Sequence, residues 1–419
     1  MASYIPELLM LKRILVERKT LRDAFFATSL TERVSKVRLT VAKNRVLEVL
    51  RHYQTLSFEC RNLFPSYEIG KEESHLVMLA LVILRKKEEE TETVRASLTE
   101  TFSSLRLFGD PEKVFSLLLA ASKAPFVVPE EVKRSPYFYN SLLLEVPEFL
   151  LRRLSEDYGA KEAVRIAKSL HGKCLSTYGA SKDRPENSIL TEAKVNETTS
   201  YFRSQRPLPL NKQKELFLYP VSFFEVNALS VASIPPLSPS VLLFGLENPI
   251  SILPYSFLLE DSFRPELVPV LSDGVKYRMA VDLSFEYHRK NMKAIFSEPS
   301  YVKTYLPYGH YDLVTCYALD SGIGLSRKKP ELLPSLRKEE LLSYNKADAE
   351  RIKEAASFVK KEGFLLYLSH SLLKAEGQNI VDSFLSRHKE FTLVAEKTVF
   401  PYETEEDGGY YAILRRVKE

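Results

Sequence analysis

Apolar residues recur at helical spacing through the first part of the chain, up to about residue 145. Val46, Leu50 and Tyr53 have the spacing of one helix face. The apolar run over residues 76–84 is too short to cross a bilayer of about 30 Å, so we interpret it as a buried helix. These patterns predict a small all-α bundle over residues 1–145.

Another helix of this region is predicted to begin at Asp110-Pro111-Glu112. Asp110 can cap the helix by accepting backbone N–H groups, and Pro111 suits the first turn because its missing N–H would have no partner there. Glu112 suits the positive end of the helix dipole. The region contains neither strand alternation nor a glycine-rich phosphate loop, so a helical bundle is the simplest interpretation.

From about residue 226 the pattern changes to short apolar runs that alternate with amphipathic segments. Apolar strands separated by helices predict a mainly parallel sheet covered on both faces, which is an α/β domain of the doubly wound type. Helices fit over Asp348–Lys361, with Gly363 expected in a left-handed conformation behind it, and over Ala375–Arg387. An acidic, glycine-containing turn at residues 405–409 predicts an antiparallel last strand. The predicted strands are Val241–Phe244, Met279–Leu283, Leu313–Cys316, Phe364–Leu368, Thr392–Ala395 and Tyr410–Leu414.

A connector is predicted between these two parts, over residues 146–225. It opens with two helices, one ending at Tyr158-Gly159 and the next covering Lys161–Leu170. A polar stretch of weak periodicity follows, over residues 176–211. We therefore expect three domains, with limits at residues 1–145, 146–225 and 226–419.

Composition and charge narrow the class of protein only slightly. The net charge is +4, which an RNA partner fits but does not require. The three cysteines, Cys60, Cys174 and Cys316, are far apart in the sequence and form no Cys-x-x-Cys pair. This usage disfavours a disulfide framework or a structural zinc site and agrees with a reducing compartment. With no secretory pattern at the start, we expect a cytoplasmic protein without a bound metal or a membrane anchor.

Three motifs in the C-terminal part carry a family resemblance. Residues 311–324 read YDLVTCYALDSGIG, residues 327–331 read RKKPE, and residues 367–371 read YLSHS. Their order is similar to that of the NusB-fused Sun/Fmu (RsmB-type) family of RNA cytosine-C5 methyltransferases, which use S-adenosylmethionine. The resemblance implies a NusB-like RNA-binding bundle at the N-terminus and a class I methyltransferase-like domain at the C-terminus.

The resemblance also locates the reaction centre, and there the chain differs from the family. The position of the family's nucleophilic cysteine holds His370, and the position of a second cysteine, which assists product release, holds Asp320. Cytosine C5 methylation needs a nucleophile at C6, for which a thiolate is well suited. Cys316 lies four residues before Asp320, within a predicted strand, and aligning it with the family cysteine would sacrifice the Ser321–Gly324 match. The sequence therefore predicts that the usual mechanism is impaired.

For the cofactor, the resemblance implies three binding positions. Gly245 follows the first predicted strand, Asp282 lies in the run that resembles the family's ribose-binding strand, and Tyr317 stands where the family has an acid. The loop over residues 245–250 keeps a single glycine, and its bulky side chains could fill the cofactor pocket. S-adenosylmethionine is thus the expected cofactor, at a site whose motifs are reduced.

Basic residues suggest where RNA would lie. Arg327, Lys328 and Lys329 match the family's basic segment and would contact phosphates. The N-terminal part adds further cations that are either a solvated helix surface or an RNA contact. They are Lys12, Arg13, Arg18, Lys19, Arg33, Lys36, Arg38, Lys43 and Arg45.

Three functional hypotheses remain open at this point. The first is an RNA-binding family member that binds structured rRNA and is catalytically impaired. The second is an active S-adenosylmethionine-dependent RNA methyltransferase with drifted motifs, which uses Asp282 for the cofactor and His370 or Asp320 in altered roles. The third is a NusB-like scaffold that binds ribosome-assembly or transcription factors through its helical domain.

Overall fold

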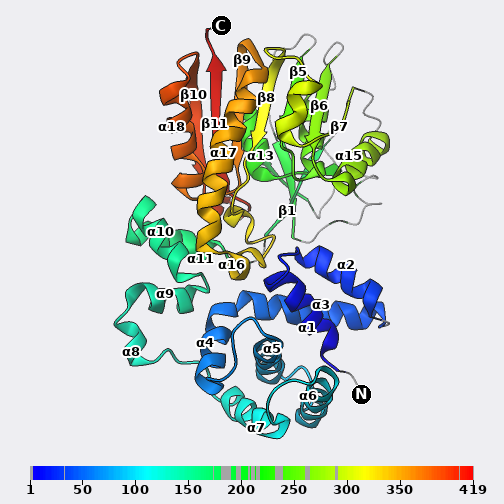
Figure 1. The fold of residues 1–419 in the computed structure, drawn as a ribbon, viewed down its shortest axis with the longest axis vertical. Helices are drawn as coiled ribbons and strands as arrows, with labels where there is room; N and C mark the ends of the chain where they lie inside the picture. Colours follow the sequence, from blue (N-terminus) through cyan, green and yellow to red (C-terminus); the bar gives the residue numbers. More distant parts are fainter. Residues whose placement is uncertain are drawn as a thin grey trace. The chain divides into compact units, whose positions relative to one another are not determined.

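The computed structural model divides the chain into two compact units. Unit 1 contains Met1–His171 and Lys329–Arg337, and unit 2 contains Gly172–Lys328 and Lys338–Glu419 (Figure 1). The described residues are 3–32, 34–172, 174–180, 190–194, 200–205, 208, 213, 218–231, 239–259, 265–287, 291–404 and 406–418.

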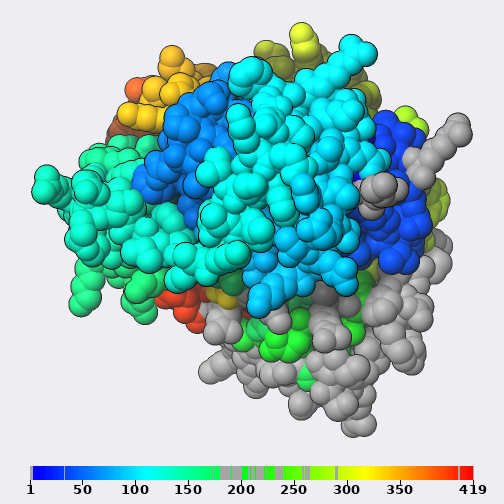
Figure 2. Space-filling view, turned by 90° about the horizontal axis from the view of Figure 1, so that it is seen from below, coloured from blue at the N-terminus to red at the C-terminus, as the bar shows by residue number. Residues whose placement is uncertain are grey.

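Unit 1 is helical, as the sequence predicts, and Figure 2 shows one of its faces in the blue-to-cyan colours of these helices. The break between the third and fourth helices falls at His52, where the apolar spacing alone gave no boundary. The helices are α1 (Ile5–Leu15), α2 (Leu21–Thr31), α3 (Lys36–Arg51), α4 (Tyr53–Leu63), α5 (Glu72–Lys86), α6 (Thr91–Leu105), α7 (Pro111–Ser122), α8 (Glu130–Lys133), α9 (Pro136–Leu144), α10 (Glu148–Tyr158), α11 (Ala160–Ser169) and α16 (Leu332–Ser335).

The core of unit 1 forms around α5. Each residue from Leu76 to Leu84 is at most 8% exposed, which is expected for a helix that is apolar on all sides. The start of α7 confirms the predicted cap, because Asp110 accepts hydrogen bonds from the backbone nitrogens of Glu112 and Lys113. The segment Lys329–Arg337 joins this unit, and the buried Glu331 accepts a hydrogen bond from the Leu21 nitrogen at 3.1 Å.

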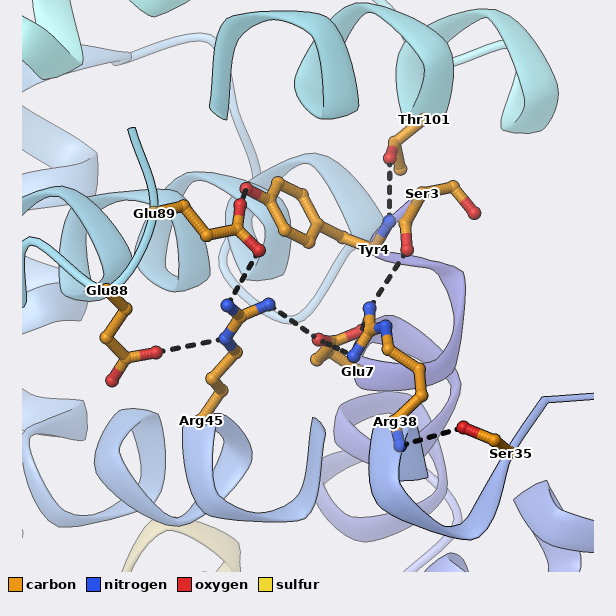
Figure 3. A network of polar contacts seen from close by, with 9 residues as sticks. All are labelled: Ser3, Tyr4, Glu7, Ser35, Arg38, Arg45, Glu88, Glu89 and Thr101. Carbon is orange, nitrogen blue, oxygen red and sulfur yellow. Dashed lines mark hydrogen bonds and ion pairs between the residues drawn. The ribbon is translucent and has the colours of Figure 1, made fainter. Parts of the chain in front are cut away.

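A buried network of charges links α1, α3 and the end of α5 (Figure 3). Glu7 is fully buried and forms a bidentate pair with Arg38, at 2.6 and 2.8 Å. Arg45, whose side chain is 5% exposed, lies 3.3 Å from Glu7, 3.0 Å from Glu88 and 2.7 Å from Glu89. Both arginines thus neutralise interior acids and do not form the free basic surface considered from the sequence. Arg33 lies outside the described residues.

Unit 2 contains a seven-stranded sheet with the order β10-β11-β9-β8-β5-β6-β7. The strands from β7 to β9 are parallel, and β11 is antiparallel to both β9 and β10, as the predicted closing strand requires. The strands are β5 (Ser240–Phe244), β6 (Glu266–Leu271), β7 (Ile295–Phe296), β8 (Tyr311–Tyr317), β9 (Val359–Ser369), β10 (Phe391–Val399) and β11 (Gly409–Arg416).

Helices cover both faces of this sheet (Figure 1). Leu242 and Phe244 of β5 face one apolar cluster with α17 and α18, whereas Val241 and Leu243 face a second cluster with α13, α14 and α15. This alternation confirms a doubly wound α/β domain. The helices are α13 (Phe223–Val231), α14 (Ile252–Leu258), α15 (Gly274–Glu286), α17 (Lys338–Phe358), α18 (Gln378–Arg387) and α19 (Pro401–Thr404), and the 3-10 turns are η1 (Pro249–Ser251), η2 (Pro299–Thr304), η3 (Ile323–Leu325) and η4 (Lys374–Glu376).

Two local predictions for unit 2 are wrong. Met279–Leu283 is not a strand but the middle of α15, and the second strand of the parallel sheet is β6, which the sequence analysis missed together with β7. The left-handed residue after α17 is Glu362, with φ 67°, and not Gly363. Gly363 lies within β9, where a Cβ atom would come within 3.0 Å of the Lys360 and Tyr311 carbonyl oxygens.

A smaller antiparallel sheet with the order β2-β3-β1-β4 belongs to the same unit. Its strands are β1 (Ser176–Ala180), β2 (Thr191–Lys194), β3 (Ser200–Ser204) and β4 (Leu218–Pro220). Much of the predicted polar connector lies outside the described residues. Among the residues that are described, no helix has the length and apolar character needed to cross a membrane.

Candidate active site

The loop after β8 is attached to the end of β9 by the carboxylate of Asp320. One oxygen accepts hydrogen bonds from the His370 nitrogen at 2.7 Å and from the Ser369 hydroxyl at 2.9 Å. The other accepts from the Gly322 nitrogen at 2.7 Å. Both oxygens are therefore used to hold backbone segments together, so Asp320 is a structural anchor in this geometry.

His370 lies at the end of β9, where its ring packs against α13. Its Nε2 atom is 3.7 Å from Glu225, and its ring makes an edge contact with Phe224 at a centroid distance of 5.2 Å. Burial alone would lower the pKa of His370, but the Glu225 carboxylate more than offsets this and the pKa lies above its usual value. Paired with Glu225 and packed against Phe224, the imidazole is not placed as a free nucleophile for a pyrimidine ring.

Two further carboxylates lie beneath this loop, and within the described part of the chain neither forms an ion pair. Asp348 of α17 accepts a hydrogen bond from the Leu319 nitrogen at 2.7 Å, and Glu376 accepts from the Ser321 hydroxyl at 2.6 Å. Both are fully buried, and burial raises the pKa of Asp348 to about 8 and that of Glu376 to about 7. The site therefore contains two buried carboxyl groups that were not among the site residues predicted from the sequence.

The turn before β11 supplies a second set of buried acids. Asp407 is fully buried, lies 3.2 Å from the Lys328 ammonium and accepts from the Ser222 hydroxyl at 2.5 Å. Glu406 is also fully buried, with Arg203 of β3 at 2.5 Å. Burial alone would raise the pKa of Asp407, but Lys328 outweighs it and the pKa is lowered. These pairs tie the small sheet and the basic segment to the last strand.

Of the cysteines, Cys174 lies within electrostatic range of Lys328 and Asp407, and the other two are buried in the cores. Cys316 is completely buried within β8, and burial raises the pKa of its thiol well above the usual value. Cys174 is half-buried, donates to the Leu175 carbonyl at 3.4 Å, and has a pKa raised to about 11, again by burial. Cys60 lies in the core of unit 1. None of the three carries a readily formed thiolate.

The predicted cofactor positions are only partly brought together. Gly245 follows β5 with φ 72°, and the Tyr317 carbonyl at the end of β8 lies beside it. The Tyr317 ring itself is buried in the sheet, with its pKa raised by burial. Asp282 is on the exposed side of α15 and not at a strand end, because its segment is helical. The acid that follows the second strand is Asp273, which caps α15.

One further residue at the carboxyl ends of β5 and β8 belongs to none of the sequence motifs. Arg351 of α17 reaches the ends of β5 and β8, where its Nη1 atom donates to the Tyr317 carbonyl at 2.9 Å. A Cβ atom added to Gly245 would lie 2.7 Å from the same nitrogen. The only signal in the sequence was a cation on the otherwise apolar side of a predicted helix, near Ile352 and Ala355.

The basic segment is divided between different environments. Lys328 pairs with Asp407 as described, and Arg327 donates to the Pro401 carbonyl at 3.4 Å. Lys329, which belongs to unit 1, is exposed. No group of three or more His, Cys, Asp or Glu side chains in the described ranges is arranged to hold a metal ion.

The strand order, with one antiparallel strand inserted beside β9, defines a class I methyltransferase fold. The crystal structure of PH0851 superimposes with a TM-score of 0.77 at 14% identity, covering 99% of both chains, and this likeness concerns the fold alone. Residues 286–415 match the family model for the 16S rRNA methyltransferase RsmB/F.

Two curated relatives agree with this assignment. Ribosomal RNA small subunit methyltransferase B of Yersinia enterocolitica is 30% identical over 111 residues, which are 25% of this chain and 26% of the relative. The protein of the same name from Thermus thermophilus is 32% identical over 108 residues, 23% of this chain and 27% of the relative. The match thus spans about a quarter of each relative. Residues 286–415 thus resemble the RsmB/F methyltransferase family, which confirms the resemblance carried by the sequence motifs.

Proposed function

We propose that this protein binds structured rRNA as a member of the methyltransferase family and does not methylate cytosine C5 by the cysteine mechanism. The observation that supports this most directly is that the side chains of His370 and Asp320 already make contacts within the protein. The imidazole is paired with Glu225, and the carboxylate uses both oxygens for hydrogen bonds to the chain. Neither group is free to form the C6 adduct that the reaction requires.

The residues at the carboxyl ends of β5 and β6 fit S-adenosylmethionine, so we infer that the cofactor site is retained. Gly245 has the left-handed backbone that permits close approach of a ligand, and Arg351 brings a cation to the same place. Asp273 uses Oδ1 for the nitrogens of Val275 and Lys276, at 2.8 Å each, and no described residue donates to Oδ2. That oxygen could accept a ribose hydroxyl. The cofactor, when bound, supplies an electrophilic methyl group.

The RNA contact proposed for this chain is electrostatic. Lys329 is exposed and directly follows Arg327 and Lys328 in the sequence. Lysine and arginine contacts to phosphates give affinity that falls steeply with salt and carry little base readout. We therefore expect rRNA binding that is strongly dependent on ionic strength.

The test compares RNA binding with methyl transfer. A small-subunit rRNA transcript is titrated with the full chain between about 50 and 200 mM salt, followed by fluorescence anisotropy. The same transcript is then incubated with the protein and tritiated S-adenosylmethionine. The Thermus thermophilus relative serves as the positive control for incorporation. We expect salt-dependent binding and no tritium in cytosine.

Other outcomes would replace the proposal. Stoichiometric incorporation into cytosine would mean an active methyltransferase whose motifs have drifted. Absence of RNA binding at low salt would instead favour a scaffold that binds ribosome-assembly or transcription factors through the helical unit.

A further inference from the structure

Arg351 occupies an unusual position for a cation on a helix that packs against a sheet. It extends from α17 to the carboxyl ends of β5 and β8, where its Nη1 atom is 2.9 Å from the Tyr317 carbonyl. The guanidinium also lies against Gly245, since a Cβ atom there would be 2.7 Å from Nη1 and 3.2 Å from Cζ. The side chain therefore touches the backbone of two neighbouring parallel strands at the edge where they end.

This edge is where a doubly wound sheet binds its ligand. From β5 the chain continues to β6 and β7 on one side, and then returns to β8 on the other side. The strand order reverses between β5 and β8, and the carboxyl ends of the strands at such a reversal are the usual ligand position in doubly wound sheets. Arg351 stands at that reversal, next to the one left-handed glycine of the first loop.

The charge of Arg351 has no acidic partner at salt-bridge distance among the residues that the structure describes. By contrast, other charged residues of α17 do form ion pairs, since Glu350 and Lys353 are 2.6 Å apart. Asp348 acts on Arg351 only at longer range, and its Oδ1 atom is held by the Leu319 nitrogen. One N–H of the guanidinium has a carbonyl partner, so most of its five donors remain for a ligand.

We propose that Arg351 binds the carboxylate of the methionine part of S-adenosylmethionine. The inference rests on the proposed retention of the cofactor site. A guanidinium presents parallel N–H donors that match a carboxylate, and a partly buried cation without an acidic partner gains most from such a ligand. Arg351 would supply from α17 the positive charge that the reduced loop after β5 does not provide.

The experiment uses two ligands that differ only in the carboxylate. Calorimetric titration of the full chain with S-adenosylmethionine and with decarboxylated S-adenosylmethionine gives the contribution of that group to affinity. The same titrations are made with Arg351→Met, with Arg351→Lys, and with Lys353→Met as a matched control on the same helix. Thermal unfolding and near-UV circular dichroism of each variant report whether it is folded.

We expect wild-type protein and Lys353→Met to bind S-adenosylmethionine more tightly than the decarboxylated ligand. Arg351→Met should bind S-adenosylmethionine about 10- to 100-fold more weakly, because a charged hydrogen-bonded pair is lost. Its affinity for the decarboxylated ligand should change little. Arg351→Lys should fall between, since it keeps the charge and loses the bidentate geometry.

Several results would overturn the inference. Equal weakening of both ligands in a folded Arg351→Met protein would mean that the residue shapes the site without binding the carboxylate. Unchanged binding of both ligands would exclude a role for Arg351 in cofactor binding. If the wild-type protein binds neither ligand, the cofactor part of the proposed function fails as well, whereas rRNA binding without methyl transfer would still stand.

Discussion

The Oδ2 atom of Asp320 lies 2.7 Å from the backbone nitrogen of His370. The two positions at which the family has cysteines are thus bonded to each other in this chain, side chain to backbone. This contact gives the acid a defined structural task, and it fixes the end of β9 relative to the loop after β8.

Replacing Asp320 should therefore destabilise unit 2. Asp320→Ala removes one carboxylate and leaves three donors without their acceptor, so we expect a loss of about 2–4 kcal/mol in the free energy of unfolding. Urea denaturation measures it, with Asp382→Ala, an exposed acid on α18, as the control. Asp320→Cys should be similarly destabilised although it restores a family residue. Equal stability of Asp320→Ala and the control would show that the carboxylate is dispensable.

Stability should also depend on pH through Asp348. Burial raises the pKa of this carboxyl to about 8 in the folded protein, against about 4 in an unfolded chain. The fold favours the neutral form, so the free energy of unfolding should fall as pH rises from about 4 through 8. The raised pKa of His370 acts in the same direction, because its contribution is complete below the usual histidine pKa and is lost as pH rises through the folded value.

Asp348→Asn tests this dependence, since it keeps the acceptor for the Leu319 nitrogen and removes the titration. We expect it to exceed wild type by about 1–3 kcal/mol at pH 8 and by much less at pH 5, measured by urea denaturation at both values. Asp382→Asn is the matched variant at an exposed site. A difference from wild type that is the same at both pH values would contradict the prediction.

Neighbouring lysines of the basic segment should behave differently. Lys328→Ala leaves the buried Asp407 without its cation, so we expect a loss of roughly 3 kcal/mol in the free energy of unfolding. This is the low end of the losses that follow when a buried ion pair is broken, because the Lys328 side chain is 29% exposed. Lys329→Ala should leave stability unchanged and reduce by about one the slope of the logarithm of the rRNA affinity against the logarithm of the salt concentration. Chemical denaturation and anisotropy titrations measure the two effects. Identical phenotypes for both variants would argue against this division.

In unit 1, Arg45 is expected to contribute strongly to stability. Arg45→Met would leave the fully buried Glu7 with Arg38 alone and would unpair Glu88 and Glu89, so a loss of about 3–5 kcal/mol is expected. Arg95→Met is the control, because its ion pairs with Glu92 and Glu112 are exposed and should contribute at most about 1 kcal/mol. Thermal unfolding followed by circular dichroism at 222 nm compares them. A mild effect at Arg45 would mean that the interior tolerates the unpaired acids.

The sequence was sufficient to predict five of the parallel and closing strands, and it failed at β6 for a physical reason. The run contains Pro269, which is unusual inside a sheet because proline cannot donate to a ladder. Leu267 and Leu271 make backbone hydrogen bonds on the side of the strand that faces β7. Every second residue of a strand directs its backbone groups to the same side, so the missing N–H of Pro269 also falls on the β7 side. Because β7 covers only Ile295–Phe296, the sheet loses little at that point.

Asp282 was wrongly expected at a strand end because its segment, which is part of α15, was predicted as a strand. The amino-acid composition of Met279–Leu283 is typical of a strand. Since only Ala280 of α15 is buried, the sequence has no helical pattern of apolar residues that would have indicated a helix. Glu225, Asp348, Glu376 and Arg351 could not be found from motifs, because each acts through a contact between elements distant in the sequence. Asp320 and His370, which were singled out in the sequence by the spacing of the surrounding glycines and serines, are in contact in the structure.

Those glycines have a consequence of their own. A Cβ atom on Gly324 would come within 2.2 Å of the Gly408 carbonyl oxygen and 2.6 Å of that of His370, and one on Gly409 would come within 2.3 Å of the Ser369 carbonyl oxygen. The residues that most clearly mark the family are thus spacers that let three stretches of main chain touch. A side chain at either position would push these stretches apart, so the packing itself requires glycine there. These glycines therefore record how the chain is assembled, and they carry no information about the reaction that it performs.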